Sequence, residues 1–256
     1  MSSTTRIVHI SDVHIGDAAP ELLADATHAI NEAKPDLIVL SGDLTQAGRK
    51  REYEGAAAFL LTLPGPIVAA PGNHDAPVYN VLARVAAPYA RFRRLPVQST
   101  WREQDNIAAA AAISTARALQ ARLDWSQGVY PLSALRAALT WSSGAAWRVL
   151  AAHHPPMTYD GARVRSDARR GRAALEILAA TPRTLLLCGH SHGFRLETLG
   201  DEASAVIVAP SLSSGRPRDG GHGFVQIDLT ADAAEIALAL RNPQGRYDLA
   251  PPTRLS

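Results

Sequence analysis

Five short segments concentrate Asp, Asn and His residues in this chain, and each follows a stretch that we predict to be a strand. They are Asp12-Val-His14, Gly42-Asp43, Gly72-Asn-His-Asp75, His153-His-Pro-Pro156 and Gly189-His-Ser-His192. In an extended segment, residues two positions apart point to the same side. We therefore expect Asp12 and His14 to face one point, and His190 and His192 to reach two neighbouring points.

The donor types in these segments predict metal chemistry. Carboxylate and imidazole donors without thiolates suit Zn²⁺, Mn²⁺ or Fe. The donors are too many for one tetrahedral ion, and two ions that share a carboxylate fit the set better. Two ions about 3.5–4 Å apart are the usual arrangement for phosphoester hydrolysis, where bound water becomes hydroxide near neutral pH. Glycines at positions 42, 72 and 189 permit the sharp turns that such a centre needs.

The order of the five segments resembles the motif set of the calcineurin-like metallophosphoesterases. The spacing is most similar to that of bacterial class III cyclic-nucleotide phosphodiesterases and glycerophosphodiesterases. Weaker likeness adds Ser114-Thr-Ala-Arg117 and Ala209-Pro-Ser211. The resemblance implies an α/β fold, a four-layer α-β-β-α sandwich of two mixed β-sheets flanked by helices, with the metals at one rim.

The resemblance also implies a role for each residue in the set. The ligands of one metal would be Asp12, His14, Asp43 and His192. The ligands of the second would be Asp43, Asn73, His153 and His190. Asp43 would thus bridge two divalent ions, either Mn, Fe or Zn.

Three further positions take their expected roles from the same resemblance. His153 rather than His154 is the expected ligand, because the family ligand precedes proline by two positions. His74 would assist departure of the alcohol, as a proton donor or electrostatic stabiliser. Asp75 would orient His74 or its loop. Both are candidate catalytic residues.

Hydrophobic periodicity predicts the elements that must position these side chains. Apolar runs predict strands over 6–11, 36–41, 66–70, 147–152, 184–188, 203–209, 224–229 and 235–240. Helical spacing predicts helices over 20–33, 51–63, 77–90, 133–140 and 167–180, with Pro77 in a first turn and with Ser133 and Asp167 as caps. The alanine-rich run 107–113 favours a helix by propensity, whereas the family resemblance favours a strand, which we adopt. We expect one domain over 1–241 and an irregular tail over 242–256.

Composition narrows the class of protein. The chain of 256 residues is 46% hydrophobic and 20% charged, with a net charge of +2, which indicates a folded globular protein. A single cysteine, Cys188, excludes a Cys-rich zinc ribbon. The apolar stretches are too short to span a bilayer, and the N-terminus lacks the apolar core of a signal peptide. We therefore expect a soluble cytoplasmic protein without a membrane partner, and leave its oligomeric state open.

The function that we expect is hydrolysis of small phosphodiesters, of cyclic-nucleotide or glycerophosphodiester type, by a metal-bound hydroxide. Phosphomonoester hydrolysis and nuclease action are alternatives within the family. The small net charge argues against a nucleic-acid partner. A non-catalytic scaffold of the same fold is an alternative of another class, but every expected ligand is present.

Several other residues have open or structural interpretations. His9, inside the first predicted strand, is expected to be a hydrogen-bonded core residue. His222 lies in a glycine-rich segment and would either reach the pocket or belong to a surface turn. Arginines that follow His153 would clamp a phosphate or lie on a solvated helix face. They are Arg163, Arg165, Arg169, Arg170 and Arg172.

Overall fold

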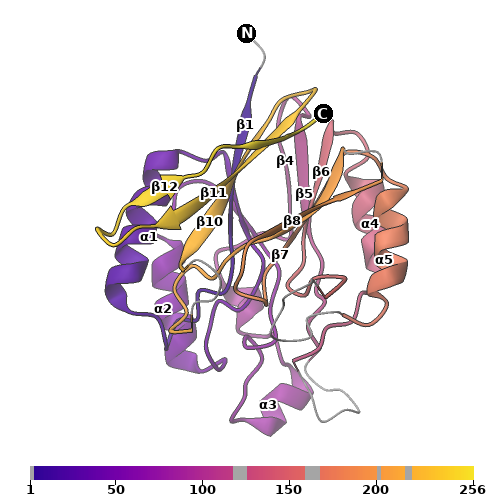
Figure 1. The fold of residues 1–256 in the computed structure, drawn as a ribbon. Helices are drawn as coiled ribbons and strands as arrows, with labels where there is room; N and C mark the ends of the chain where they lie inside the picture. The colour runs from indigo at the N-terminus through magenta and orange to yellow at the C-terminus, as the bar shows by residue number, and fades with distance from the viewer. Residues whose placement is uncertain (1–2, 118–125, 159–167, 201–202, 217–220) are drawn as a thin grey trace.

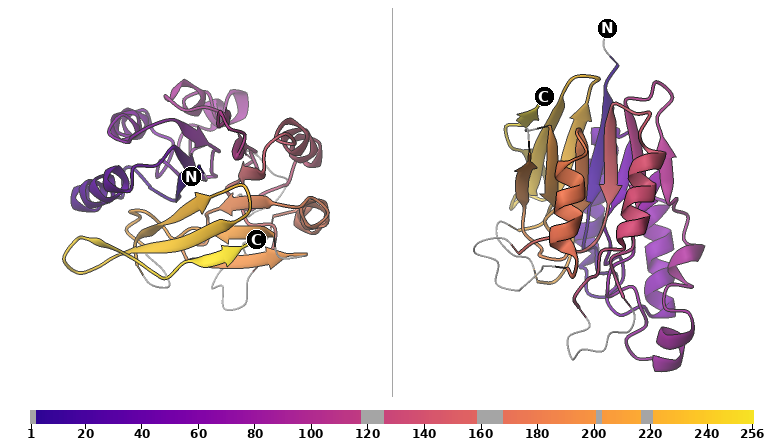
Figure 2. Two further views of the ribbon diagram at one scale, coloured as in Figure 1. Left: turned by 90° about the horizontal axis from the view of Figure 1, so that it is seen from above. Right: turned by 90° about the vertical axis from the view of Figure 1, so that its right-hand side faces the viewer.

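Two β-sheets pack face to face, and helices cover their outer faces (Figures 1 and 2). The structure, a computed structural model, describes residues 3–117, 126–158, 168–200, 203–216 and 221–256. Both sheets mix parallel and antiparallel strands. The chain therefore forms the four-layer α-β-β-α sandwich that the sequence led us to expect.

The first sheet joins the beginning and the end of the chain. Its strands are β1 (Thr5–Ile10), β2 (Leu37–Leu40), β3 (Ile67–Ala69), β10 (Gly223–Leu229), β11 (Ala234–Arg241), β12 (Tyr247–Leu249) and β13 (Thr253–Leu255). The order is β12-β11-β10-β1-β2-β3, and β13 also pairs with β11. Strands β1, β2 and β3 are parallel, so their carboxyl ends lie at one edge of the sheet.

The second sheet contains the middle of the chain. Its strands are β4 (Thr100–Arg102), β5 (Ala108–Ala112), β6 (Trp147–Ala151), β7 (Thr184–Cys188), β8 (Arg195–Leu199) and β9 (Ser204–Val208). The order is β4-β5-β6-β7-β9-β8, with β5, β6, β7 and β9 parallel and both edge strands antiparallel. The carboxyl ends of β6 and β7 therefore share an edge.

Four of the five helices, α3 excepted, bury one face against a sheet. They are α1 (Pro20–Ala33), α2 (Lys50–Leu60), α3 (Val81–Ala86), α4 (Leu132–Trp141) and α5 (Gly171–Ala179), with a 3₁₀ turn at Phe92–Arg94. Residues four positions apart lie on one helix face, and such pairs are buried in four helices. They are Ala26 and Ile30 in α1, Ala56 and Leu60 in α2, Leu135 and Leu139 in α4, and Ala174 and Leu178 in α5.

Three apolar clusters fill the three spaces between the four layers. Strand alternation sends Ile7 into the space between the sheets and Val8 toward α1 and α2. A third cluster lies between the second sheet and α4 and α5. Because both faces of each central strand are covered, all four residues of β2 are buried. Each fully buried Leu or Ile side chain contributes about 1.5–3 kcal/mol to the stability of the fold.

Several element boundaries differ from the sequence-based predictions. Helix α3 is shorter than the predicted 77–90, because the Asn80 side chain accepts a hydrogen bond from the Ala83 N–H and starts the helix there. Ser133 lies inside the first turn of α4 rather than at its cap. Helix α5 begins at Gly171, and the expected cap Asp167 lies outside the described residues. The edge strands β4 and β8 were not predicted, since their residues are exposed or only partly buried and form no apolar run.

The expectation of an irregular tail over 242–256 is wrong. Strands β12 and β13 both pair with β11, and they extend the first sheet at its edge. Tyr247 stacks on Phe224, and Leu255 is buried. The Pro and Gly residues that suggested irregularity lie in the turns around these three-residue strands. None of the helices in the described residues is long and apolar enough to cross a bilayer.

Candidate metal centre

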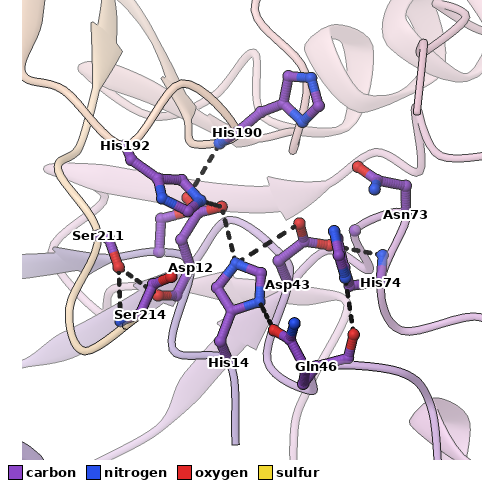
Figure 3. Close-up of polar contacts among 12 residues, drawn as sticks. Asp12, His14, Asp43, Gln46, Asn73, His74, His190, His192, Ser211 and Ser214 are labelled. Atoms are coloured by element: carbon purple, nitrogen blue, oxygen red, sulfur yellow. Dashed lines mark hydrogen bonds and ion pairs between the residues drawn. The ribbon is translucent and has the colours of Figure 1, made fainter. Parts of the chain in front are cut away.

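Loops from both sheets bring the predicted donor residues together at one rim of the sandwich (Figure 3). The loops after β1, β2 and β3 supply Asp12, His14, Asp43 and Asn73. The loops after β6 and β7 supply His153, His190 and His192. Parallel strands end at a common edge, which is where open α/β sheets place their ligands. This convergence agrees with the expectation from the five donor segments.

The backbone at these donors is not extended, which corrects the reason that we gave for their convergence. The φ angles of Asp12 and His14 are both 52°, and those of Asp43, His190 and His192 are 50°, 71° and 58°. Non-glycine residues rarely adopt this left-handed conformation, which carries strain and is concentrated at functional sites. The tight turns, rather than strand alternation, direct these side chains to the centre.

Asp12 anchors a first group of donors with His14 and His192. Its Oδ2 accepts hydrogen bonds from the Ser11 hydroxyl at 2.6 Å and from the His190 backbone N–H at 2.9 Å. Its Oδ1 lies 3.2 Å from His192 Nε2 and 3.8 Å from His14 Nε2. One carboxylate oxygen is thus fixed by the protein, and the other is presented to two imidazole rings.

Asp43 lies between this group and a second one. Its Oδ1 accepts a hydrogen bond from the His74 backbone N–H at 2.8 Å. Its Oδ2 lies 3.1 Å from His153 Nε2 and 3.9 Å from His14 Nε2, and so faces both groups. His153 Nε2 also lies 3.2 Å from Asn73 Oδ1. The His190 ring completes this second group, with its centroid 5.1 Å from that of His153.

Three histidines are oriented by acceptors behind the centre. The Nδ1–H of His14 donates to Gln46 Oε1 at 2.8 Å, that of His153 to the Ser41 carbonyl at 2.8 Å, and that of His192 to the Arg216 carbonyl at 3.2 Å. A carbonyl oxygen can only accept, so each Nδ1 carries a proton, and Nε2 is the nitrogen of each ring that is left to face the centre. All three Nε2 atoms face Asp12 or Asp43. Such acceptors typically orient metal-ligating histidines.

His154 also lies beside His153 and His190, but its nitrogens are already engaged. Its Nε2–H donates to the Ser126 carbonyl at 2.7 Å, and its Nδ1 accepts from the Thr115 hydroxyl at 3.0 Å. A ring in this state has no lone pair to offer a cation. The geometry therefore favours His153 over His154, and it gives Thr115, from the 114–117 segment, a structural role.

Two buried atoms at the centre lack hydrogen bonds and fit a bound cation. Asp12 Oδ1 and His14 Nε2 are buried and make no hydrogen bond in the described part of the chain. Leaving a buried polar group unsatisfied costs about 1–3 kcal/mol. A divalent cation between them would satisfy both atoms, and oxygen and imidazole donors suit Zn, Mn and Fe. The residues present therefore fit a metal.

The electrostatics keep both carboxylates ionised. Burial alone raises the pKa of Asp12 and Asp43, but the charges of His192 and His153 outweigh it and hold both pKa values below the usual range. Burial lowers the pKa of His153, yet the Asp43 carboxylate raises it to about 9. Burial and the nearby His153 lower the pKa of His190 to about 4. Both carboxylates of the centre therefore stay ionised and can attract a cation.

His74 and Asp75, the candidate catalytic residues, lie in different places. His74 lines the pocket over the centre, and its Nδ1–H donates to the Gln46 carbonyl at 2.7 Å, which leaves Nε2 free to face a substrate. Asp75 is fully buried below the loop. Its carboxylate accepts from the Gly72 N–H at 2.9 Å and from the Thr45 N–H at 2.9 Å. Asp75 therefore positions the loop and does not reach the pocket.

Two glycines are required by close packing at the centre. A Cβ at Gly42 would lie 2.7 Å from His153 Nδ1, and the φ angle of Gly42 is 94°. A Cβ at Gly72 would collide with the backbone N and Oδ1 of Asp43. Both positions were expected to be turns, and the structure shows that they also leave room for ligand side chains.

Five residues that line the pocket were not indicated by the sequence, namely Asp17, Gln46, Ser126, Ser214 and Arg216. Gln46 supports His14 through its side chain and His74 through its carbonyl. Arg216 lines the pocket, which has a volume of about 180 Å³. A lone Gln or Arg has no spacing signature, so only the fold identifies them. The Ser211 hydroxyl, from the 209–211 segment, donates to the Asp12 carbonyl at 2.7 Å and holds the first ligand loop.

The structure describes some of the residues whose interpretation was open. His222 Nε2–H donates to the Ser214 carbonyl at 2.8 Å, and the residue does not line the pocket. Arg163 and Arg165 lie outside the described residues. Arg172 pairs with Glu176 on an exposed face of α5, as the solvated interpretation expected. His9 is fully buried, and its Nε2 lies 2.9 Å from the Ser41 hydroxyl, which confirms its place in the core.

The fold and the donor set define a two-sheet α/β protein with a His- and Asp-rich centre at one rim. The family model for the calcineurin-like phosphoesterases matches residues 5–194. The chain therefore belongs to this family of metal-dependent hydrolases that act on phosphoesters. Its Asp and His groups are able to bind metal.

Curated relatives match a limited part of the chain. It is 35% identical over 80 residues to the glycerophosphodiester phosphodiesterase GpdQ of Enterobacter lignolyticus, which covers 27% of this chain and 29% of the relative. It is 31% identical over 83 residues to a probable cyclic nucleotide phosphodiesterase of Synechococcus, which covers 29% of this chain and 32% of the relative. These matches span less than a third of either relative.

The fold is similar to that of a solved dimetal phosphatase from Danio rerio. The TM-score is 0.67 at 14% identity, and the alignment covers 97% of this chain and 99% of that structure. At this identity the likeness concerns the fold. It supports the sandwich architecture over the full length of the chain.

Proposed function

We propose that the protein is a binuclear metal-dependent phosphodiesterase that hydrolyses small phosphodiesters. The observation that carries the proposal is the position of Asp43 Oδ2, which faces His14 Nε2 of one donor group and His153 Nε2 of the other. A carboxylate in this position can bridge two cations. The proposed ligand sets are those of the sequence analysis, with Asn73 as a neutral oxygen donor.

Bound divalent ions would supply Lewis-acid charge for the phosphoryl oxygens and would acidify water. The chain's own residues contribute orientation and proton transfer. The Gln46 carbonyl fixes the His74 ring, so that its Nε2, when protonated, can donate to the departing alkoxide oxygen. Arg216 lines the same pocket and can pair with a phosphate oxygen. The volume of about 180 Å³ favours a compact substrate over a polymer.

The names of the matched relatives support a diester as the substrate. One is a glycerophosphodiester phosphodiesterase and another a probable cyclic nucleotide phosphodiesterase. Phosphomonoester hydrolysis remains the second candidate, because the Danio rerio structure of similar fold is a dimetal phosphatase. The two candidates differ in the substrate that the same centre would turn over fastest.

Substrate panels with defined metal content test the proposal. We expect bis-p-nitrophenyl phosphate and cyclic nucleotides to be hydrolysed faster than p-nitrophenyl phosphate, with activity lost to a chelator and restored by Mn²⁺. The Asp43→Asn variant should lose about a thousandfold in kcat, because several kcal/mol of transition-state stabilisation depend on the ions. The exposed Asp232→Asn variant serves as the matched control.

Two outcomes would contradict the proposal in different ways. A preference for the monoester would replace the diesterase with a phosphatase. Full metal occupancy by elemental analysis without turnover of any ester would favour the non-catalytic scaffold.

A further inference from the structure

Exposed apolar side chains are concentrated on one small lobe that follows the His74 loop. Large apolar residues that are exposed in the described chain number eight, and five of them lie between positions 78 and 85. They are Val78, Tyr79, Val81, Leu82 and Val85. The most exposed are Leu82 at 83% and Tyr79 at 72%. Contiguous exposed apolar patches usually mark interaction surfaces.

The lobe, residues 76–95, is held by the buried side chains of Phe92 and Leu95 and by polar contacts. The buried Arg84 guanidinium donates to the Pro77 carbonyl at 3.2 Å. The Val78 N–H donates to the Ala47 carbonyl at 3.1 Å. Arg91 donates to the Gly48 carbonyl at 3.0 Å. These contacts fix α3 with its apolar side chains directed outward, and Figure 1 shows α3 projecting beyond the rest of the molecule.

The charged residues of the segment that carries the patch are all basic. Residues 76–95 contain Arg84, Arg91, Arg93 and Arg94 and no Asp or Glu. Arg93 and Arg94 are exposed. Arg49, from the neighbouring loop, lies over the Tyr79 ring at 4.4 Å from its centroid. The exposed apolar side chains of α3, together with the arginine rim formed by Arg49, Arg93 and Arg94, suit a partner that is apolar inside and anionic at its surface.

We propose that this lobe docks the protein on an anionic phospholipid surface. Leu82, Val81 and Val85 would enter the boundary between head groups and acyl chains, and the arginines would contact the head groups. A symmetric dimer formed through this patch fits less well. It would place the arginines of the two copies against each other, and residues 76–95 contain no carboxylate to pair with them. The projecting shape of α3 also suits insertion better than a broad interface.

This inference concerns a surface and goes beyond the proposed function. It replaces the sequence-based expectation of no membrane partner, which rested on the lack of a spanning segment and did not address peripheral docking. The donor loop of Asn73 and His74 immediately precedes the lobe. Docking would therefore bring the metal centre close to the lipid surface.

Vesicle sedimentation of the full-length protein tests the inference without any turnover. We expect binding to vesicles in which a third of the phosphatidylcholine is replaced by phosphatidylglycerol, weaker binding to pure phosphatidylcholine, and a decrease with added salt. Leu82→Asp should weaken binding about tenfold or more, since a Leu side chain is no longer buried. Leu61→Asp, at the residue that follows α2 and is 75% exposed, is the matched control and should bind like the wild type.

A second variant tests the charged rim. Arg93→Ala combined with Arg94→Ala should reduce binding to anionic vesicles about tenfold and leave binding to neutral vesicles unchanged, because each basic residue near the surface adds to the attraction. Light scattering on the same samples reports the oligomeric state. Equal binding of Leu82→Asp and the wild type would overturn the proposal. So would a dimer that Leu82→Asp dissociates, together with no vesicle binding.

Discussion

At the scale of single residues, the centre depends on side chains that hold other side chains. Gln46 accepts from His14 Nδ1 and, through its backbone carbonyl, from His74 Nδ1. Asp12 is fixed through Oδ2 and presents Oδ1. For Asp12, Oδ2 is held by the protein and Oδ1 is left to bind a metal ion; for Gln46, the side chain and the backbone carbonyl each hold a histidine ring. Such support residues carry a large share of the metal affinity.

Substitution of Gln46 tests this support. Gln46→Leu removes the acceptor behind His14 and keeps a similar volume. We expect metal affinity to fall about 10–100-fold, because the His14 ring loses its fixed tautomer and orientation. Competition titration with a chromogenic chelator measures the affinity. Gln244→Leu, on an exposed turn, is the control. An unchanged affinity would show that the His14 ring needs no acceptor.

At the scale of elements, tight turns after the strands set the geometry of the centre. Strand ends bring five loops to one rim, but left-handed residues and close-packed glycines aim the side chains. Gly72 lets its loop pass over Asp43, and its N–H donates to Asp75. The strand register therefore fixes the place of the centre, and the turns fix its ligand directions.

Substitution of Gly72 tests the role of the turn. In Gly72→Ala the new Cβ would displace the Asp43 backbone or carboxylate. We expect a loss of at least about a hundredfold in activity, because small displacements in a catalytic site have effects of this size. Gly144→Ala is the control, since a Cβ there meets only the end of a flexible arginine side chain at 3.4 Å. Steady-state kinetics with the diester would show the difference, and equal activity in both variants would contradict this role.

At the scale of the whole molecule, the first sheet places a neutral histidine in the space between the sheets. His9 shares its strand face with Ile7, and burial lowers its pKa to about 3. In the unfolded chain the His9 imidazole takes up a proton as the pH falls through about 6.5, whereas in the folded chain it stays neutral there. The stability that His9 contributes is thus fully present above pH 6.5 and is lost as the pH falls toward 3.

Chemical denaturation at two pH values tests this contribution. The wild type should lose unfolding free energy when the pH is lowered from 7 to 5, and His9→Gln should lose about 2 kcal/mol less. The difference follows from about 1.36 kcal/mol for each pH unit below 6.5. His28→Gln, exposed on α1, should behave like the wild type. An identical pH dependence for His9→Gln and the wild type would show that His9 is protonated in the folded state.

The sequence alone indicated the seven donor residues of the centre and most of the elements that carry them. Apolar runs such as 184–188 and helical spacing such as 20–33 depend on local periodicity, so their positions were predictable. The order of the five donor segments was sufficient to indicate the family. These features depend on residue types and their spacing along the chain, which can be known without the tertiary contacts.

Tertiary structure decided what local patterns could not. The alanine run 108–112 is a strand because small side chains pack between the sheets, although its local propensity favours a helix. The tail forms β12 and β13 because β11 offers them a free edge. His153 is distinguished from His154 in space by the acceptors of each ring, and Gln46 and Arg216 have no motif. Contacts between residues distant in the chain determine these features, so they cannot be predicted from any short stretch of sequence.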